Sequence, residues 1–329
     1  MEQIKKLIIS SLLLLVILRL EGQDDTFKPG GKPVFLLFNN IHATFNSGNV
    51  APAFEITRLY LGYEYSFSRS LSARANIDIG NPGAGGLQMT AYVRHAYMRY
   101  QSDKFSARTG MIGTDQFSLI DQHWGYRYVA KTLQDEYGFG PSADLGAAVK
   151  YSPAKYISLD ASVLNGEGFR RIESDSALKY TLGITLTPVE NLKLRGYTDF
   201  MKKDALQNTF SFFAAYTYDN ARVGVEYSMQ KNNRMISGHD FSGISVFSSM
   251  SFYQYYSIFA RYDYVWSVKL TALSPDPWNI AADGHLLIAG FEFSPLKGIR
   301  ISPVFRGRIP AAKTGSFTAS PGLYFEIKL

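Results

Sequence analysis

The chain has 329 residues, a net charge of +6 and no cysteine. The lack of cysteine excludes a disulfide framework, a cysteine nucleophile and a cysteine-ligated metal. A sequence pI of about 9.2 would suit a nucleic-acid partner, but the lysines and arginines are dispersed singly, which argues against one. Aromatic residues make up 15% of the chain, and almost no helical periodicity accompanies them.

The first residues have the pattern of a secretory signal peptide. Lys5 and Lys6 precede an apolar run from Leu7 to Leu18. That run has about a dozen residues, whereas a spanning helix needs ~20. We therefore expect residues 1–22 to be a signal peptide that is cleaved after Gly22, and residues 23–329 to form the mature domain.

From Pro33 onward, the chain consists of short segments in which every second residue is apolar. About sixteen such segments of roughly ten residues follow one another, and ten residues is the length that a tilted strand needs to cross a bilayer. The apolar face persists in nearly every segment, whereas the opposite face carries Arg, Lys, Asp, Glu, Ser and Gly. This pattern predicts strands with one face in lipid and the other facing a wet lumen.

The connections between the segments separate a membrane barrel from a soluble sandwich. Those near Ser68 and Asp219 are tight, and those near Ser47, Gly83 and Lys203 are longer. Alternating short periplasmic turns and long outer loops is typical of a closed outer-membrane barrel. The sequence therefore predicts an all-β chain: a transmembrane antiparallel β-barrel of about 16 strands, in contact with outer-membrane lipid of a gram-negative bacterium.

One long segment, Gly113 to Ser142, interrupts the alternation between the fifth and sixth predicted strands. It mixes six aromatic residues with six charged ones. A loop of this length in a compact domain is usually functional, and aromatic side chains require a surface to pack against. We expect this loop to fold inward into the barrel.

Several motifs in this region resemble the phosphate-selective porin O/P-like family of gram-negative outer membranes. They are RHAYMRY (Arg94 to Tyr100), RTGMIGT (Arg108 to Thr114), WGYRYV (Trp124 to Val129), SADLGAAV (Ser142 to Val149) and VLNGEGF (Val163 to Phe169). The resemblance implies a sixteen-stranded barrel, often a homotrimer, that passes small anions and is narrowed by an inward-folded loop. The chain departs from a phosphate-specific pattern because it has no dense run of arginines and lysines.

Pore selectivity depends on diameter and lining charge. The lumen-facing cations predicted from the alternation are Arg58, Arg74, Arg99, Arg108, Lys150, Lys193, Arg195, Arg222, Arg261, Arg300, Arg306 and Arg308. The residues predicted to line the pore or its constriction are Arg108, Arg127, Lys131, Asp121, Arg99, Arg195, Arg300 and Arg306. An alternative for Arg127 is a pair with Asp121, Asp135 or Glu136 that holds the loop to the wall. Arg94 falls on the opposite face from Arg99, which would place it above the membrane.

The predicted function is passive diffusion of small, anionic, hydrophilic solutes, phosphate among them, through an outer-membrane porin. One alternative is a non-conducting structural or adhesive barrel in which the loop plugs the lumen. Another is an outer-membrane hydrolase, for which Asp121 and His123 would be the nearest candidate pair. The sequence predicts no cofactor, metal or nucleic-acid partner.

Overall fold

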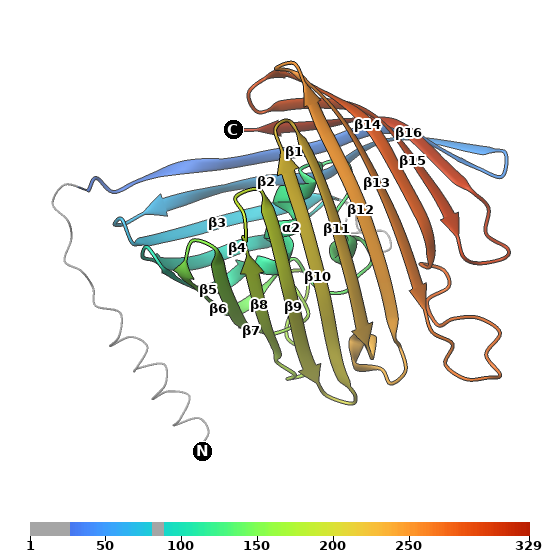
Figure 1. Cartoon of the computed structure of the whole chain (residues 1–329), viewed down its shortest axis with the longest axis horizontal. Helices are drawn as coiled ribbons and strands as arrows, with labels where there is room; N and C mark the ends of the chain where they lie inside the picture. The colour runs from blue at the N-terminus through green and yellow to red at the C-terminus, as the bar shows by residue number, and fades with distance from the viewer. Residues whose placement is uncertain (1–26, 81–88) are drawn as a thin grey trace.

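The computed structural model describes residues 27–80 and 89–329, so the predicted signal peptide and the predicted long connection near Gly83 lie outside the described residues. Sixteen antiparallel strands form one closed barrel, in which β1 pairs with β16 (Figure 1). The predicted fold and strand number are confirmed. The strands are β1 (Gly30–Asn46), β2 (Asn49–Ser66), β3 (Leu71–Gly80), β4 (Thr90–Gln101), β5 (Phe105–Gly113), β6 (Ala143–Ala154), β7 (Ile157–Leu164), β8 (Lys179–Leu186), β9 (Leu192–Lys202), β10 (Leu206–Tyr218), β11 (Ala221–Lys231), β12 (Phe241–Phe252), β13 (Tyr256–Ser267), β14 (Gly284–Leu296), β15 (Ile299–Pro310) and β16 (Thr318–Lys328).

The outer face of the barrel is apolar. Leu61, Leu182, Phe212 and Ile258 point outward with side chains that are 40–53% exposed, and Tyr264 stacks on Trp266 near one rim with ring centroids 4.9 Å apart. A closed barrel with an apolar exterior and an aromatic rim is the architecture of the gram-negative outer membrane. The predicted location is therefore confirmed. Among the described residues, no helix is both long enough and apolar enough to cross a membrane.

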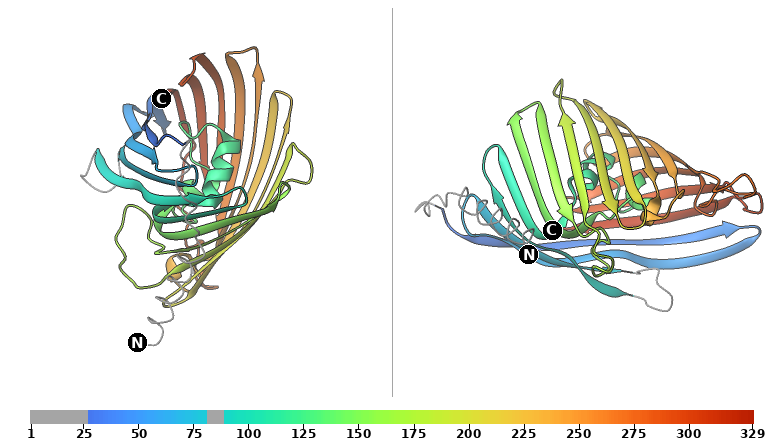
Figure 2. Two further views of the ribbon diagram at one scale, coloured as in Figure 1. Left: turned by 90° about the vertical axis from the view of Figure 1, so that its left-hand side faces the viewer. Right: turned by 90° about the horizontal axis from the view of Figure 1, so that it is seen from below.

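The two rims of the barrel differ, although less regularly than predicted. The connections near Ser47 and Lys203 are short, not long: β1 and β2 are joined by two residues, and β9 and β10 by three. The height of the barrel wall varies instead with strand length, because β1 and β2 have 17 and 18 residues whereas β7 and β8 have 8 each. The wall is therefore much higher around β1 and β2 than around β7 and β8 (Figure 2).

Two single-residue bulges interrupt the alternation in the first part of the wall. Thr57 is an extra residue in β2, between positions paired with Phe38 and Asn39, and Arg94 is an extra residue in β4, opposite the step from Asn76 to Ile77. A bulge changes which residues face inward beyond it. The outward face that strict alternation gives Arg94 is therefore wrong, because the bulge leaves its side chain buried inside the barrel.

The inner face is not polar throughout, which corrects the expectation of a uniformly wet lumen. Large apolar side chains point inward from strands on one side of the barrel and are buried there; they are Phe38, Phe213, Phe247, Phe259, Leu286, Ile288, Val304 and Tyr324. An apolar inner wall would be unfavourable against water. Something must cover it, and the long loop does.

We expect a charge on the outer face to destabilise the barrel. Leu182 lies in the middle of β8 and faces outward, so Leu182→Arg should lower the free energy of unfolding by about 2–4 kcal/mol, the cost of arginine at the bilayer midplane. The measurement is urea unfolding in lipid vesicles. The matched control is Ser158→Arg, at an inward position of β7; equal destabilisation by both variants would contradict the assigned faces.

Candidate functional site: the loop inside the barrel

The segment between β5 and β6 lies inside the barrel and contains two helices. They are α2 (Asp115–Trp124) and α3 (Leu133–Glu136), and the strands enclose α2 in both views of Figure 2. Helix α2 ends at Gly125, whose φ of 75° is the left-handed conformation that glycine adopts without strain. The chain can thus turn sharply and lead the aromatic residues after Gly125 along the inner wall.

Buried polar contacts hold the two ends of this loop. At its start, Arg108 of β5 pairs with Asp115 in the first turn of α2. At its end, the bulged Arg94 donates hydrogen bonds to the carbonyl and the hydroxyl of Ser142, at 3.2 and 3.1 Å. Because charged donors make the stronger hydrogen bonds, both ends of the loop are fixed to the wall.

The middle of the loop packs on the apolar inner wall. Tyr126 stacks on Phe259 with centroids 3.9 Å apart, and Trp124 meets Phe247 edge-on at 5.5 Å. The buried indole of Trp124 donates to the carbonyl of Ala130 at 2.9 Å, and the Tyr128 hydroxyl donates to Glu292 at 2.7 Å. Aromatic pairs in these geometries add stability beyond the area that they bury. The loop therefore fills one side of the lumen as a packed core.

Arg127 forms an ion-pair clamp within the loop. Its guanidinium contacts both oxygens of Asp121, at 2.9 and 2.8 Å, and Asp135 at 2.5 Å. Burial raises the pKa of Asp121 above its ordinary value despite the neighbouring Arg127. Burial alone would also raise the pKa of Asp135. The positive charges of Arg127 and Lys131 outweigh this effect and hold the pKa of that carboxyl well below its ordinary range. The pairing alternative for Arg127 is therefore the one that the structure shows, with Asp121 and Asp135 as partners.

Three other predicted pore residues are also neutralised by carboxylates. Arg195 makes a bidentate pair with Asp160 and donates to Gln116 of α2 at 2.7 Å. Arg300 pairs with Glu292 and Glu326. Arg99 lies near the short-turn rim, 3.6 Å from Glu64. These side chains, like Arg108 and Asp121, stabilise the wall and the loop rather than line the cavities described next.

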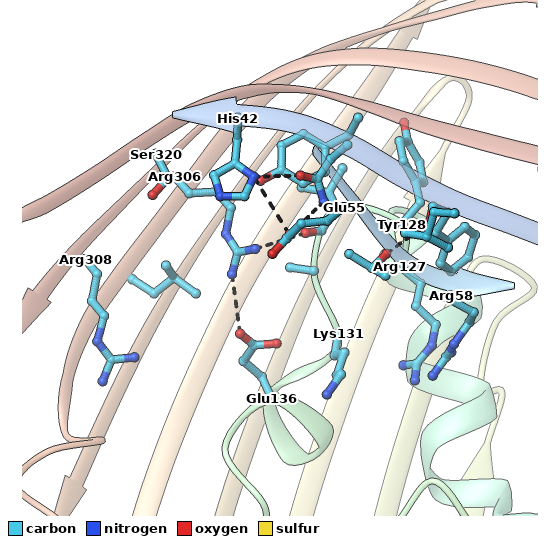
Figure 3. Close-up of a pocket in the computed structure, with 18 of the residues that line it drawn as sticks. His42, Glu55, Arg58, Arg127, Tyr128, Lys131, Glu136, Arg306, Arg308 and Ser320 are labelled. Atoms are coloured by element: carbon cyan, nitrogen blue, oxygen red, sulfur yellow. Dashed lines mark hydrogen bonds and ion pairs between the residues drawn. The ribbon is translucent and has the colours of Figure 1, made fainter. Parts of the chain in front are cut away.

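A cavity of about 540 Å³ remains between the loop and the wall formed by β1, β2, β15 and β16. Figure 3 shows Lys131 and Glu136 facing it from the loop, and His42 and Glu55 from the wall. Its six cationic side chains are Arg58, Arg127, Lys131, Arg170, Arg306 and Arg308, and its two carboxylates are Glu55 and Glu136. A second cavity of about 410 Å³ shares Arg58, Lys131 and Arg170 with the first. Cations outnumber carboxylates in its lining too, since Arg171 and Arg234 add to the three shared cations and Asp135, Glu167 and Asp175 are its carboxylates.

Only some of these cations retain an uncompensated charge. Arg58 lies 3.3 Å from Asp78, and Arg306 lies 3.4 Å from Glu136. Within the described part of the chain, no carboxylate lies within 4 Å of Lys131, Arg170 or Arg308. Of the eight predicted pore residues, Arg127, Lys131 and Arg306 line the cavity, and of these three Lys131 alone has no described carboxylate within 4 Å.

Sequence reasoning missed two residues of the cavity, Arg170 and Glu55. Arg170 follows the VLNGEGF motif in the loop after β7, where its guanidinium lies over the rings of Phe169 and Tyr92. An arginine directly after an outer-loop motif was the available signal. Glu55 was missed because β2 begins at Asn49 and contains the Thr57 bulge, neither of which the alternation reveals.

The described residues suggest no catalytic pair or metal centre in the loop. The carboxylate of Asp121 is bound by Arg127, whereas His123 contacts the carbonyl of Leu119 through Nδ1 at 2.9 Å. One acidic group, Glu167, Glu173 and Asp175, has ligand atoms within 4.8 Å of one another on the loop after β7. Backbone N–H groups of the same loop donate to one oxygen of each of these carboxylates.

The fold matches several solved outer-membrane proteins at low sequence identity. OprB of Pseudomonas putida aligns with a TM-score of 0.72 and 8% identity over 91% of this chain and 94% of that one. An anion-selective porin from Comamonas acidovorans aligns with a TM-score of 0.63 and 10% identity over 92% and 100%. The trimer form of OmpT from Vibrio cholerae aligns with a TM-score of 0.58 and 16% identity over 91% and 100%. No protein-family model and no curated protein sequence matches the chain.

These likenesses identify the class of fold, a sixteen-stranded porin-type barrel of the outer membrane. At such low identities they show the fold and nothing finer. The resemblance to phosphate-selective porins remains a prediction from the sequence motifs.

The two carboxylates of the Arg127 clamp should respond differently to neutralisation. The folded-state pKa of Asp135 is lowered, so its pairing contributes stability above its ordinary pKa near 4, and this is lost as the pH falls through the lower folded value. The pKa of Asp121 is raised by burial, so folding disfavours its ionised form relative to the unfolded chain in water. Asp135→Asn should therefore loosen the loop more than Asp121→Asn does.

Hydrogen exchange of the amides at 126–137 at pH 7 measures this difference. We expect Asp135→Asn to accelerate exchange by about a hundredfold, as follows from breaking a buried ion pair, and Asp121→Asn to have a smaller effect. Faster exchange in Asp121→Asn than in Asp135→Asn would contradict the assignment.

Proposed function

We propose that this chain is a porin, a water-filled channel through which small hydrophilic solutes diffuse passively with a preference for anions. The observation that carries the proposal is the cavity beside the loop, where six cations face two carboxylates. Lys131, Arg170 and Arg308 have no described carboxylate within 4 Å, so their charges are the least neutralised of the six. Fixed lining charge of one sign, close to the path of an ion, is the property by which a pore selects.

Cations on the other side of the loop support the same conclusion. Lys193 donates to the Thr187 hydroxyl at 2.8 Å, and Arg222 donates to the Ser249 hydroxyl and to the carbonyl of Gln122. Both residues lie near the rim with short turns, which is the periplasmic rim of such barrels. An anion that leaves the cavity would therefore meet further positive charge rather than a repulsive region.

Phosphate is one solute in the proposed range, without being favoured over other small anions. Arg127, Arg195 and Arg300 could each bind a phosphate bidentately, but carboxylates already occupy their guanidinium groups. The uncompensated cations come from three separate segments of the chain. We therefore propose general attraction of small anions.

A non-conducting barrel is the second candidate, and the packed loop favours it. Trp124, Tyr126 and Tyr128 fill one side of the lumen as they would fill the core of a soluble domain. Conductance separates the two candidates. We propose no enzymatic role, because Asp121 and His123 have separate partners.

We also propose that the barrel assembles as a homotrimer in outer-membrane lipid. The OmpT structure above is a trimer form, and small outward-facing residues cover a band across β3 to β7 on this chain, namely Ala75, Ala96, Ala107, Ala147 and Ala161. A smooth face allows another barrel to approach closely. Light scattering of the detergent-solubilised protein, corrected for bound detergent, would give three chains per particle.

Planar-bilayer recording tests the porin proposal. In a KCl gradient, we expect a reversal potential that shows preference for chloride. The double substitution Lys131→Gln with Arg308→Gln should lower the chloride-to-potassium permeability ratio by about two- to fivefold, as expected for solvated charges that each contribute modestly. If phosphate blocked the current more strongly than sulfate at the same concentration and in the same KCl solution, the pore would also be specific for phosphate.

The matched control is Lys155→Gln, which removes an exposed cation in the turn between β6 and β7. This variant should leave the permeability ratio unchanged. A folded barrel without conductance would favour the plugged alternative, and a potassium-selective wild type would overturn the anion preference.

A further inference from the structure

The wall opposite the loop carries a small polar cluster that the anion-selective function does not require. It consists of Asn40 and His42 on β1 and Glu55 on β2; Figure 3 shows His42 beside Glu55. Asn40 Nδ2 donates to Glu55 at 3.3 Å, and His42 Nδ1 lies 2.7 Å from Asn40 Oδ1 and 3.8 Å from Glu55. All three side chains face the cavity of about 540 Å³.

Glu55 differs from three other lumenal carboxylates in its partners and is far more exposed than Glu226, which also lacks an arginine within 4 Å among the described residues. Asp78, Asp160 and Asp263 each pair with an arginine. Among the described residues, no lysine or arginine lies within 4 Å of Glu55, and its side chain remains 44% exposed. Its neighbours are the amide of Asn40 and the imidazole of His42, which orient the carboxylate. Glu55 therefore presents a negative charge to the cavity.

The same cavity thus presents uncompensated charges of both signs. Lys131 reaches it from the loop and Arg308 from β15, whereas Glu55 lies on the wall formed by β1 and β2. Glu55 repels a simple anion, and the two cations repel a simple cation. A solute that carries both charges can place each one beside its opposite. The volume lies within the ~300–1,000 Å³ range of small-molecule sites.

We propose that this cavity is a binding site for small zwitterions that carry both a carboxylate and an ammonium group, the class of free amino acids and short peptides. Glu55 binds the ammonium group, and Lys131 and Arg308 bind the carboxylate. Asn40 and His42 position Glu55. The proposal rests on the porin function above, since the site lies in the proposed conduction path and supplies its solute class.

Current block tests the proposal with two solutes of similar size and no net charge. Glycylglycine is a zwitterion at pH 7, and N-acetylglycinamide carries no charged group. In a planar bilayer with KCl, glycylglycine should reduce the mean current at lower concentrations than N-acetylglycinamide does. Glu55→Gln should raise the glycylglycine concentration for half-block by about two- to fivefold, the loss expected from one solvated charge contact, and leave the effect of N-acetylglycinamide unchanged.

Glu64→Gln is the matched control. Glu64 also faces the lumen, but it lies near the short-turn rim between Arg74 and Arg99, away from the cavity. This variant should alter the permeability ratio for KCl and leave the glycylglycine block as in the wild type. Equal changes in both variants would show that net lumenal charge, not a site at Glu55, controls the block, and would overturn the proposal.

The outcomes also separate this proposal from the porin function. Anion-preferring conductance with identical responses to the two solutes would overturn the zwitterion site and leave the porin function intact. A folded barrel without conductance would overturn both.

Discussion

Every peptide group that crosses the hydrocarbon layer must find its hydrogen-bond partner within the protein, because each unpaired group there costs several kcal/mol. In this chain the requirement is met by closing sixteen strands between β1 and β16. Closure leaves an interior that lipid cannot reach, and that interior can be filled independently of the outer face. The loop between β5 and β6 uses this freedom.

Two kinds of interaction divide the interior. On one side, aromatic side chains of the loop and the wall form a dry core around Trp124 and Phe259. Elsewhere, guanidinium groups and carboxylates neutralise one another, as Arg127 does with Asp121 and Asp135. Breaking such a pair leaves a buried charge without a partner, which is costly. These residues therefore fix the shape of the cavity between the loop and the wall. The few remaining unpaired charges, among them Lys131 and Glu55, determine which solutes this space can attract.

The alternation of residues was sufficient to predict the barrel, its strand number and its outer face, because a lipid-facing strand allows few departures from period two. It identified most lumenal cations for the same reason. It could not predict which of them are neutralised, since the pairs of Arg127 and Arg195 depend on how the loop lies across distant strands. It also failed at Arg94 and Glu55, because each lies on a strand that contains a bulge, and a bulge changes the face without changing residue type.

The bulges at Thr57 and Arg94 have a consequence for how this wall can vary in length. Because side chains alternate with a period of two, a strand that gained one residue would turn its apolar residues inward and its charges toward lipid. Residues can therefore be added to a strand or removed from it in pairs. A single residue can be added only where it forms a bulge, outside the pairing with the neighbouring strand. Deleting Arg94 would restore regular pairing with β3 but would also remove the side chain that holds Ser142. At this position, the geometry of the strand and the attachment of the loop cannot change separately.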